Sequence, residues 1–493
     1  MTGRLPFWKD LLAEGFTQRP IFWQRVMLIL AMIVAALLRL LRLGNLGLDL
    51  TGGSADVNAL KQISGDLRVY LADPQGLNGP FAALAGLLAH IFGPTPLAAL
   101  LPSAIIGTAT VLAIYALTIE ILRQTGRHEQ LGVALLAALL TATSNWHVSL
   151  SRSGTEVVLL PLLLCLALWA LLRGFYWLGL PEGEVEESGW VTRRSRIIAH
   201  FTVAGIATGL ACDLAPGIWI TPLVIVGFLL VWRWRQPHLF TREIHRPLLA
   251  LLGASVISAA PTIWQFVSPY IGFSAGSLVF ARSSVPPNSV PPLFSDVYWT
   301  QVGANAVAIV RLLVTQDYSA GYPATGGAPI IPPYLGAFFY LGIVIIVYQL
   351  IVRRDMTALA LTLLLALPLL ATVTVSSPPS IIEAASILPA TCIVPALALY
   401  ETAAWVGRLP IVLDRLNGAR VFSTPEQIGR VALFIFLSIS ALRTFYWYFE
   451  ATLPTSGSSA YTPGSVALGV GLTFARIALA LTPNPAPIHL IAP

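Results

Sequence analysis

Charged side chains are scarce in this sequence. Asp, Glu, Lys and Arg together make up 11% of its 493 residues, whereas apolar residues make up 56%. Soluble domains usually contain about 25% charged residues, so this composition excludes an ordinary water-soluble protein. Apolar runs of about 18 residues or more recur along the chain, and each is long enough to cross a ~30 Å hydrocarbon core as a helix. The sequence therefore predicts an all-α, polytopic protein embedded in the lipid bilayer.

Cysteine and the common nucleotide-binding and metal-binding motifs are rare or missing. The three cysteines, Cys165, Cys212 and Cys392, all lie inside apolar runs, which argues against a disulfide framework or a cysteine metal site. The dinucleotide-binding, P-loop, HExxH and EF-hand patterns do not occur. We therefore expect no cofactor and no divalent metal ion.

The formal net charge of +6 would suit a nucleic-acid partner, but the positions of the basic residues favour membrane topology instead. The predicted spans are 26–43, 98–122, 131–149, 155–177, 199–214, 216–232, 248–268, 333–352, 357–375, 381–406 and 431–448. With the N-terminus in the cytoplasm, most of the 29 Lys and Arg residues fall in cytoplasmic segments, as the positive-inside rule requires. We predict about eleven transmembrane helices, a cytoplasmic N-terminus, an exterior C-terminus and no nucleic-acid partner.

The predicted spans divide the chain into a transmembrane domain, 1–448, and a short exterior tail, 449–493. Two exterior loops within the domain are large, namely 44–97 and 269–332. The first loop contains an apolar run too short to span, for which we expect an interfacial or re-entrant helix. In the second loop, residues 297–313 predict a helix whose apolar face could lie on the membrane.

The first exterior loop is rich in ionisable residues for so apolar a chain. They are Asp49, Asp56, Lys61, Asp66, Arg68 and Asp73. Ionisable groups near lipid are costly to place and therefore suggest a function. A carboxylate can take the proton from an acceptor hydroxyl, while basic side chains neutralise a departing phosphate. We predict Asp49 and Asp56 as candidate catalytic bases. We predict Lys61, Arg152 and Arg282 as candidate phosphate-binding residues.

Other polar residues at the exterior ends of the spans have simpler explanations. The further acidic candidates are Glu156, Asp213, Asp296, Asp317 and Glu383. Each of these groups, and each of those in the first loop, could merely solvate a loop end or pair with a neighbour. His147, in the segment NWHVSLSR, is more typical of a hydrogen-bonded anchor at a membrane interface than of a ligand or base. The tryptophans that fit interfacial aromatic belts are Trp23, Trp146, Trp177, Trp232, Trp234 and Trp299.

Several segments, in order along nearly the whole chain, are similar to one known family. The most specific is WHVSLSR followed by LLPL, within residues 135–174, and segments 93–117, 278–285, 316–343 and 378–390 agree with it. The chain resembles the bacterial protein O-mannosyltransferase-like glycosyltransferases (family 39 type) of the GT-C superfamily. The resemblance implies a GT-C-like helical bundle in the inner (plasma) membrane, a polyprenyl-phosphate-sugar donor, an exterior active site and inversion at the sugar carbon. It also implies an acidic base in the first exterior loop.

The first loop departs from the family pattern at the position of that base. Family members usually carry an Asp-Glu pair a few residues after the first span. Aligned without gaps, the pair falls on Thr51 and Gly52, between Asp49 and Asp56. If Asp49 or Asp56 is the base, the loop backbone must place it differently from the base of its relatives.

Other positions also differ. An Arg-Glu-Pro step common before the short helix here reads Asn78-Gly79-Pro80, and Glu383 stands where an arginine is common. Arg152 and Arg282 match arginines of the family. Relatives often continue into a soluble exterior domain, whereas the tail of this sequence is short.

These observations leave two main hypotheses. The chain is either an active membrane glycosyltransferase or a catalytically inactive homologue that serves as a scaffold subunit of a membrane complex. A transporter is disfavoured, because no pair of interrupted apolar segments occurs in matching halves of the sequence.

Overall fold

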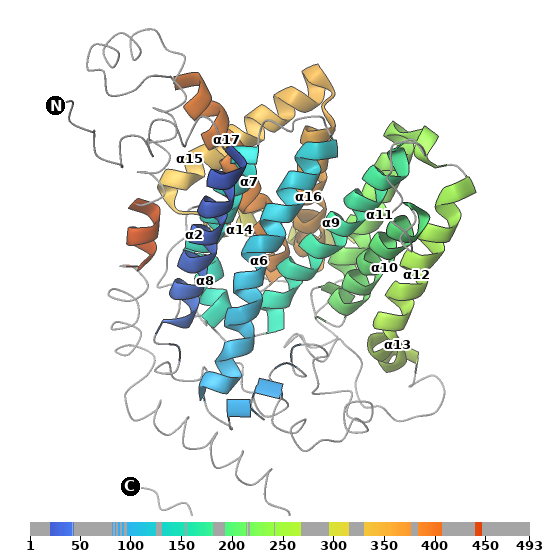
Figure 1. The fold of residues 1–493 in the computed structure, drawn as a ribbon, viewed down its shortest axis with the longest axis horizontal. Helices are drawn as coiled ribbons and strands as arrows, with labels where there is room; N and C mark the ends of the chain where they lie inside the picture. The colour runs from blue at the N-terminus through green and yellow to red at the C-terminus, as the bar shows by residue number, and fades with distance from the viewer. Residues whose placement is uncertain are drawn as a thin grey trace, which may run out of the picture.

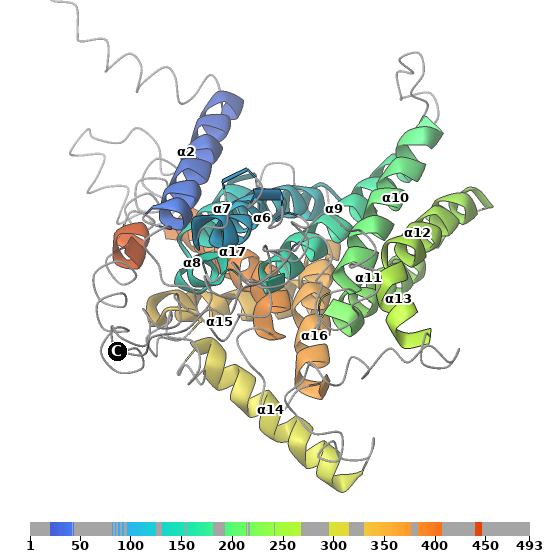
Figure 2. The same ribbon diagram turned by 90° about the horizontal axis from the view of Figure 1, so that it is seen from below.

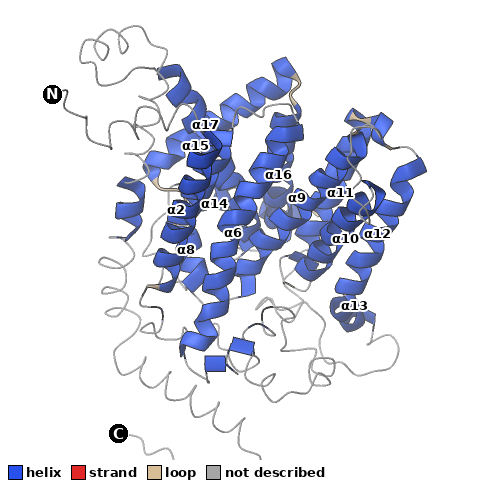
Figure 3. Ribbon diagram, viewed as in Figure 1, coloured by secondary structure: helices blue, strands red, loops and turns tan. Residues whose placement is uncertain are grey.

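The computed structural model describes 20–41, 43, 81, 84, 87, 88, 91, 92, 96–124, 131–152, 154, 156–180, 193–212, 214, 217–240, 242–267, 295–314, 330–375, 383–406 and 439–445. The regular structure in these residues is helical throughout, and no strand occurs among them (Figure 3). The predicted all-α class is therefore confirmed. The candidate residues Asp49, Asp56, Lys61 and Arg282 lie outside the described part of the chain.

The helices form an elongated bundle (Figure 1). In chain order they are α2 (Pro20–Leu40), α6 (Pro96–Gln124), α7 (Leu131–Thr143), α8 (Asn145–Arg152), η4 (Glu156–Val158), α9 (Leu159–Gly179), α10 (Arg193–Cys212), α11 (Gly217–Arg235), η6 (Pro237–Leu239), η7 (Arg242–Ile244), α12 (His245–Ser258), α13 (Ala260–Val267), α14 (Asp296–Val314), α15 (Pro333–Tyr348), η11 (Gln349–Arg353), α16 (Met356–Val375), η12 (Glu383–Ile387) and α17 (Leu388–Val406). Among the described residues, six helices are long and apolar enough to cross a membrane, or seven if one bent pair counts as a span. The total of eleven spans stays a prediction.

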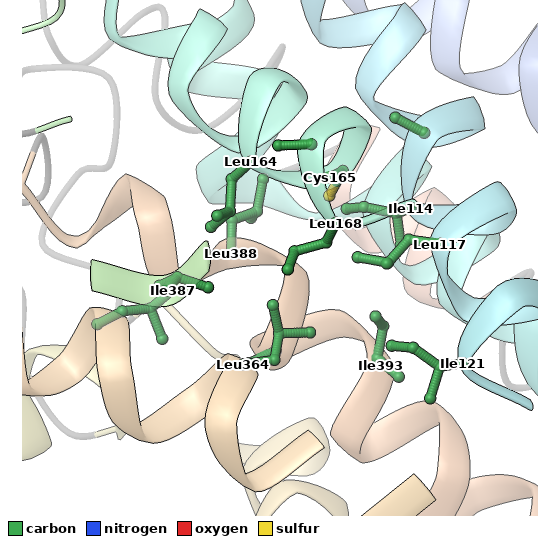
Figure 4. Packing of buried hydrophobic residues seen from close by; sticks show 14 of the residues in the cluster. Ile114, Leu117, Ile121, Leu164, Cys165, Leu168, Leu364, Ile387, Leu388 and Ile393 are labelled. Carbon is green, nitrogen blue, oxygen red and sulfur yellow. The ribbon is translucent and has the colours of Figure 1, made fainter. Parts of the chain in front are cut away.

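Helix α9 lies at the centre of the hydrophobic core and is the most buried of the six candidate spans. It packs between α6 and α10, and it also touches η12 and α17. Figure 4 shows the aliphatic side chains that meet there from α6, α9, α16, η12 and α17: Ile114, Leu117, Ile121, Leu164, Cys165, Leu168, Leu364, Ile387, Leu388 and Ile393. Cys165 and Cys392 are buried free thiols within this apolar packing.

The segment predicted as one span over 131–149 is bent. Helices α7 and α8 meet at an angle of 55° at Ser144. The hydroxyl of Ser144 accepts a hydrogen bond from the backbone N–H of His147 at 3.4 Å, as an N-cap residue does, so α8 begins as a new helix. Residues 146–152 of α8 are all buried, and the bend therefore carries the polar side chains of a short helix into the bundle.

The prediction that Trp146 and Trp232 belong to interfacial aromatic belts is wrong, because both side chains are buried. Trp146 and Trp232 are 2% and 1% exposed, respectively, and Trp232 stacks on Phe228 inside the bundle. Both rings fill the interior because helix packing covers them on all sides. Trp234 and Trp299, in contrast, are exposed, as expected for belt residues.

Helix α14 confirms the helix predicted for the second large loop. Asn305, Ile309 and Leu313 form its buried face, and the amide of Asn305 donates to the carbonyl of Val373 on α16 at 3.0 Å. The opposite face exposes the apolar side chains of Val297, Trp299, Val307 and Val310. Figure 2 shows α14 at the periphery of the bundle. Contact of this face with the membrane stays a prediction.

Two glycines bring α10 and α12 into close contact. Gly205 and Gly209, four residues apart, form a GxxxG pattern that lies against the backbone of α12. A Cβ atom at Gly205 would overlap the carbonyl oxygen of Leu251 and lie 2.9 Å from the Cβ of Ala254. The two helices therefore pack backbone to backbone, with no room for a side chain at either glycine.

We expect Gly205→Ala to lower the free energy of unfolding by about 1–3 kcal/mol, because the overpacked helices must separate. Gly253→Ala is the matched control, since Gly253 lies on α12 and a Cβ added there would have no atom within 4 Å. This control should be neutral or stabilise the protein by up to about 1 kcal/mol through helix propensity. Denaturant unfolding of both variants in the same detergent measures the difference. Equal effects of the two substitutions would contradict the packing argument.

Candidate functional site

The described part of the chain contains one of the predicted site residues, Arg152. It is the last residue of α8 and is 3% exposed. Its Nη1 donates to the carbonyl oxygens of Leu38, Arg39 and Leu41 at 3.0, 3.0 and 2.8 Å. The carbonyls of Leu38 and Arg39 belong to the last turn of α2, and that of Leu41 follows directly after it. The end of a helix has no helical partners for its last carbonyls and carries a partial negative charge. Arg152 therefore caps α2 at the point from which the chain continues into the first large loop.

A second buried arginine lies next to Arg152, which donates a hydrogen bond to its carbonyl oxygen. Arg39 of α2 is fully buried, and its guanidinium hydrogen-bonds to residues of three helices. Nε donates to Ser151 Oγ at 3.3 Å, and Nη1 donates to the carbonyls of Ala35 and Ala142 at 3.0 and 3.2 Å. Nη2 donates to the carbonyl of Thr141 at 3.1 Å and lies 2.7 Å from Nδ1 of His147. These contacts use all five N–H groups of the side chain, and every one of the acceptors is neutral.

The contact with Arg39 fixes the protonation pattern of His147. A guanidinium only donates hydrogen bonds, so Nδ1 of the imidazole must be the acceptor. In the neutral ring, the proton then sits on Nε2. This nitrogen is buried and has no hydrogen-bond partner within the described part of the chain. His147 therefore presents one N–H donor and has no free acceptor nitrogen, which fits the anchor role predicted for it and excludes a base role in this arrangement.

Close packing by glycine allows these polar groups to meet. Gly107 of α6 lies directly against the side chain of Ser151, and any Cβ at this position would overlap it. Gly154, after the end of α8, adopts a φ of 70°, which favours glycine, and its N–H donates to Ser103 Oγ at 3.2 Å. The turn at Gly154 leads into η4, where Glu156 is half-buried.

We call Arg39, His147, Ser151 and Arg152 the α2–α8 polar cluster. It lies at the lower end of the bundle in Figure 1, where α2 ends and α6 begins. It offers two guanidinium charges and an imidazole N–H, all of which stabilise negative charge. None of these groups accepts a proton from a substrate, so a base for acid–base chemistry must come from another residue.

Arg39 is the member of the cluster that the sequence analysis did not single out. Its position inside the first predicted span was the available signal, because an ionisable residue within a span usually faces the bundle interior. Its partners on other helices lie more than 100 residues away along the chain, and the local sequence gives no indication of them.

One part of the chain matches a known protein family. Residues 80–176 match the family described as dolichyl-phosphate-mannose-protein mannosyltransferase. The matched range contains α6, α7 and α8, and hence three of the four residues of the polar cluster. No curated protein matches the chain.

Solved structures also align with most of this chain. The oligosaccharyltransferase AglB from Archaeoglobus fulgidus, in complex with an inhibitory peptide and a dolichol-phosphate, aligns with a TM-score of 0.52 and 19% identity over 87% of this chain and 56% of AglB. ArnT from Cupriavidus metallidurans, bound to undecaprenyl phosphate, aligns with a TM-score of 0.46 and 16% identity over 95% of this chain and 77% of ArnT. The chain thus spans little more than half the length of AglB.

The fold shared with AglB makes this chain a GT-C-fold membrane protein. Together with the family match over residues 80–176, it supports the resemblance to the GT-C superfamily of membrane glycosyltransferases that the sequence indicated.

Proposed function

We propose that the protein transfers a sugar from a polyprenyl-phosphate donor to an acceptor hydroxyl at the exterior face of the membrane. The observation that carries this proposal is the position of Arg152, a buried cation at the point where α2 ends and the acidic first loop begins. AglB, which has a similar fold, is described in complex with a dolichol-phosphate. A phosphate-bearing lipid is the substrate class that a cationic cluster at such a position would suit.

In the proposed reaction, Asp49 or Asp56 takes the proton of the acceptor hydroxyl. The hydroxyl oxygen forms a bond to the anomeric carbon, and the bond from that carbon to the phosphate oxygen breaks. The electron pair leaves with the polyprenyl phosphate, whose charge Lys61, Arg152 and Arg282 neutralise. Attack opposite the leaving group inverts the configuration, and the reaction uses no metal ion or cofactor.

Purified protein incubated with labelled polyprenyl-phosphate sugars is expected to transfer label to an acceptor hydroxyl. The readout is label moved from the lipid to a water-soluble acceptor or to protein. Boiled protein and the Arg152→Gln variant are the controls, and Arg152→Gln should reduce transfer if the cation stabilises the leaving phosphate. Absence of transfer with every polyprenyl-phosphate sugar tested would contradict the proposal.

The second candidate function is that of an inactive scaffold subunit in a membrane complex. Two observations favour it. Thr51 and Gly52 occupy the usual place of the acidic pair, and Nη1 of Arg152 is engaged with the end of α2. Under this hypothesis the protein purifies from its native membrane as a stoichiometric component of a larger assembly. The same preparation then shows no transfer.

A further inference from the structure

A different charged cluster lies at the opposite end of the bundle, where α6 and α9 end and α10 begins. Its centre is Glu120 of α6, whose side chain is 2% exposed. Oε2 of Glu120 accepts hydrogen bonds from Arg123 of α6 and from Arg173 of α9, each at 3.2 Å. One carboxylate oxygen therefore holds two guanidinium groups side by side.

Two aromatic rings and a third arginine extend this pair of arginines into a row in which guanidinium groups and rings alternate. The guanidinium of Arg123 lies 5.4 Å from the ring centre of Tyr176, and that of Arg173 lies 5.2 Å from the same ring. Arg173 also lies 5.5 Å from the ring centre of Trp177, and Arg196 of α10 lies 5.1 Å from it. We call Arg123, Arg173, Arg196 and the two rings the arginine–aromatic ladder. Cation–π contacts of this kind hold the guanidinium groups in place.

The ladder is more positive than its own partner can neutralise. Among the described residues, its three arginines carry three positive charges, against the single negative charge of Glu120. The side chains of Arg123 and Arg173 remain 27% and 24% exposed, so part of each is accessible from outside the bundle. Guanidinium groups fixed in this way match the geometry of phosphate oxygens.

The position of the ladder at the ends of predicted spans indicates which class of phosphate ligand it binds. Arg123 is in the last turn of α6, Arg173 is in the last two turns of α9, and Arg196 is in the first turn of α10. All three helices are candidate membrane spans by length and composition. We therefore expect the ladder, which lies at their ends, at the depth of lipid headgroups. We propose that the ladder is a binding site for the phosphate headgroup of an anionic phospholipid. This site is independent of the proposed glycosyl transfer, because the α2–α8 polar cluster lies at the other end of the bundle.

The connector between α9 and α10 is the main competitor for the ladder. Residues 181–192 include four glutamates, at positions 182, 184, 186 and 187. If these glutamates paired with the arginines of the ladder, the protein would not bind anionic lipid in preference to neutral lipid. The experiment therefore uses the complete chain, in which the connector is present.

The protein is reconstituted in nanodiscs of phosphatidylcholine alone or with added phosphatidylglycerol. Native mass spectrometry counts the bound lipid molecules, and thermal unfolding gives the midpoint temperature in each lipid. We expect phosphatidylglycerol to be retained preferentially and to raise the midpoint. Arg196→Gln should weaken phosphatidylglycerol binding by about fivefold, the typical contribution of one basic residue at an anionic surface. Arg194→Gln is the matched control, because it removes the same charge from an exposed position on the same helix but leaves the ladder intact, so it should weaken binding less than Arg196→Gln does.

The variant Glu120→Gln distinguishes an effect on lipid binding from an effect on the stability of the fold. It removes the negative charge that competes with lipid, so it should increase the phosphatidylglycerol-induced rise in the midpoint, even though it lowers the midpoint in phosphatidylcholine. If the ladder had only a structural role, Arg196→Gln and Glu120→Gln would each lower the unfolding midpoint by an amount that does not depend on the lipid. That result would overturn the proposal. The proposal would also be overturned if Arg194→Gln and Arg196→Gln lost phosphatidylglycerol binding equally, or if the protein showed no preference for phosphatidylglycerol. A third contradicting result is that inorganic phosphate, added to phosphatidylcholine nanodiscs, stabilises the protein as much as phosphatidylglycerol does.

Discussion

Asparagine at the position of the catalytic base is expected to lower sugar transfer by about 10²–10⁴-fold, the usual contribution of general-base catalysis. Asparagine has nearly the shape of aspartate but cannot take the proton of the acceptor hydroxyl. The need for a separate base follows from the α2–α8 polar cluster, in which Nδ1 of His147 already accepts a hydrogen bond from Arg39. Initial rates for Asp49→Asn and Asp56→Asn, with labelled polyprenyl-phosphate sugar, measure the loss.

A large loss in one of the two variants identifies the base. Glu243→Gln is the control for the removal of a carboxylate, because Glu243 is an exposed residue of η7, which the sequence places on the cytoplasmic side. It should leave the rate unchanged. Transfer that persists in both aspartate variants at the rate of the natural protein would rule out the assignment of the base.

Methionine in place of Arg39 is expected to lower the free energy of unfolding by roughly 2 kcal/mol. Side-chain hydrogen bonds between membrane helices contribute about 0.6 kcal/mol each on average, and Arg39 makes four of them, to α7 and α8. Arg39→Lys should recover only part of this loss, because an ammonium group keeps the charge but cannot reach acceptors on three helices at once. Unfolding titrations in mild detergent provide the measurement.

Arg25→Met is the matched control for this substitution. Arg25 is on the same helix, α2, but is exposed, so its replacement should change stability by no more than about 0.5 kcal/mol. If Arg39→Met and Arg25→Met were equally stable, the hydrogen bonds of Arg39 would not be holding α2 against α7 and α8.

Span boundaries were predictable from the sequence because they depend on the length of an apolar run. The run 98–122 corresponds to the span Leu100–Arg123, and 155–177 corresponds to Glu156–Gly179. The bend between α7 and α8 was not predicted, because hydropathy averaged over a window takes no account of one capping side chain. Ser144 and Asn145 are typical helix-start residues, and they were the available signal.

The candidate site was less predictable than the fold. Arg152 could be selected because it lies at the end of an apolar segment and matches an arginine of the resembled family. Its bonds to the last carbonyls of α2 could not be inferred, since they depend on how two helices more than 100 residues apart are placed. For Asp49, Asp56, Lys61 and Arg282, the sequence remains the basis of the assignment.

The hydrogen bonds of Arg39 also have a consequence for the order of events during synthesis. Helix α2 enters the membrane with a charged residue whose interhelical partners begin 102 residues later in the chain. At a synthesis rate of about 5–20 residues per second, α2 waits roughly 5–20 s before α7 and α8 exist. During this interval the guanidinium, close to the end of its helix, extends toward the headgroups and water. The buried position of Arg39 thus depends on a late step, the arrival of α7 and α8, whose acceptors hold the guanidinium inside the bundle.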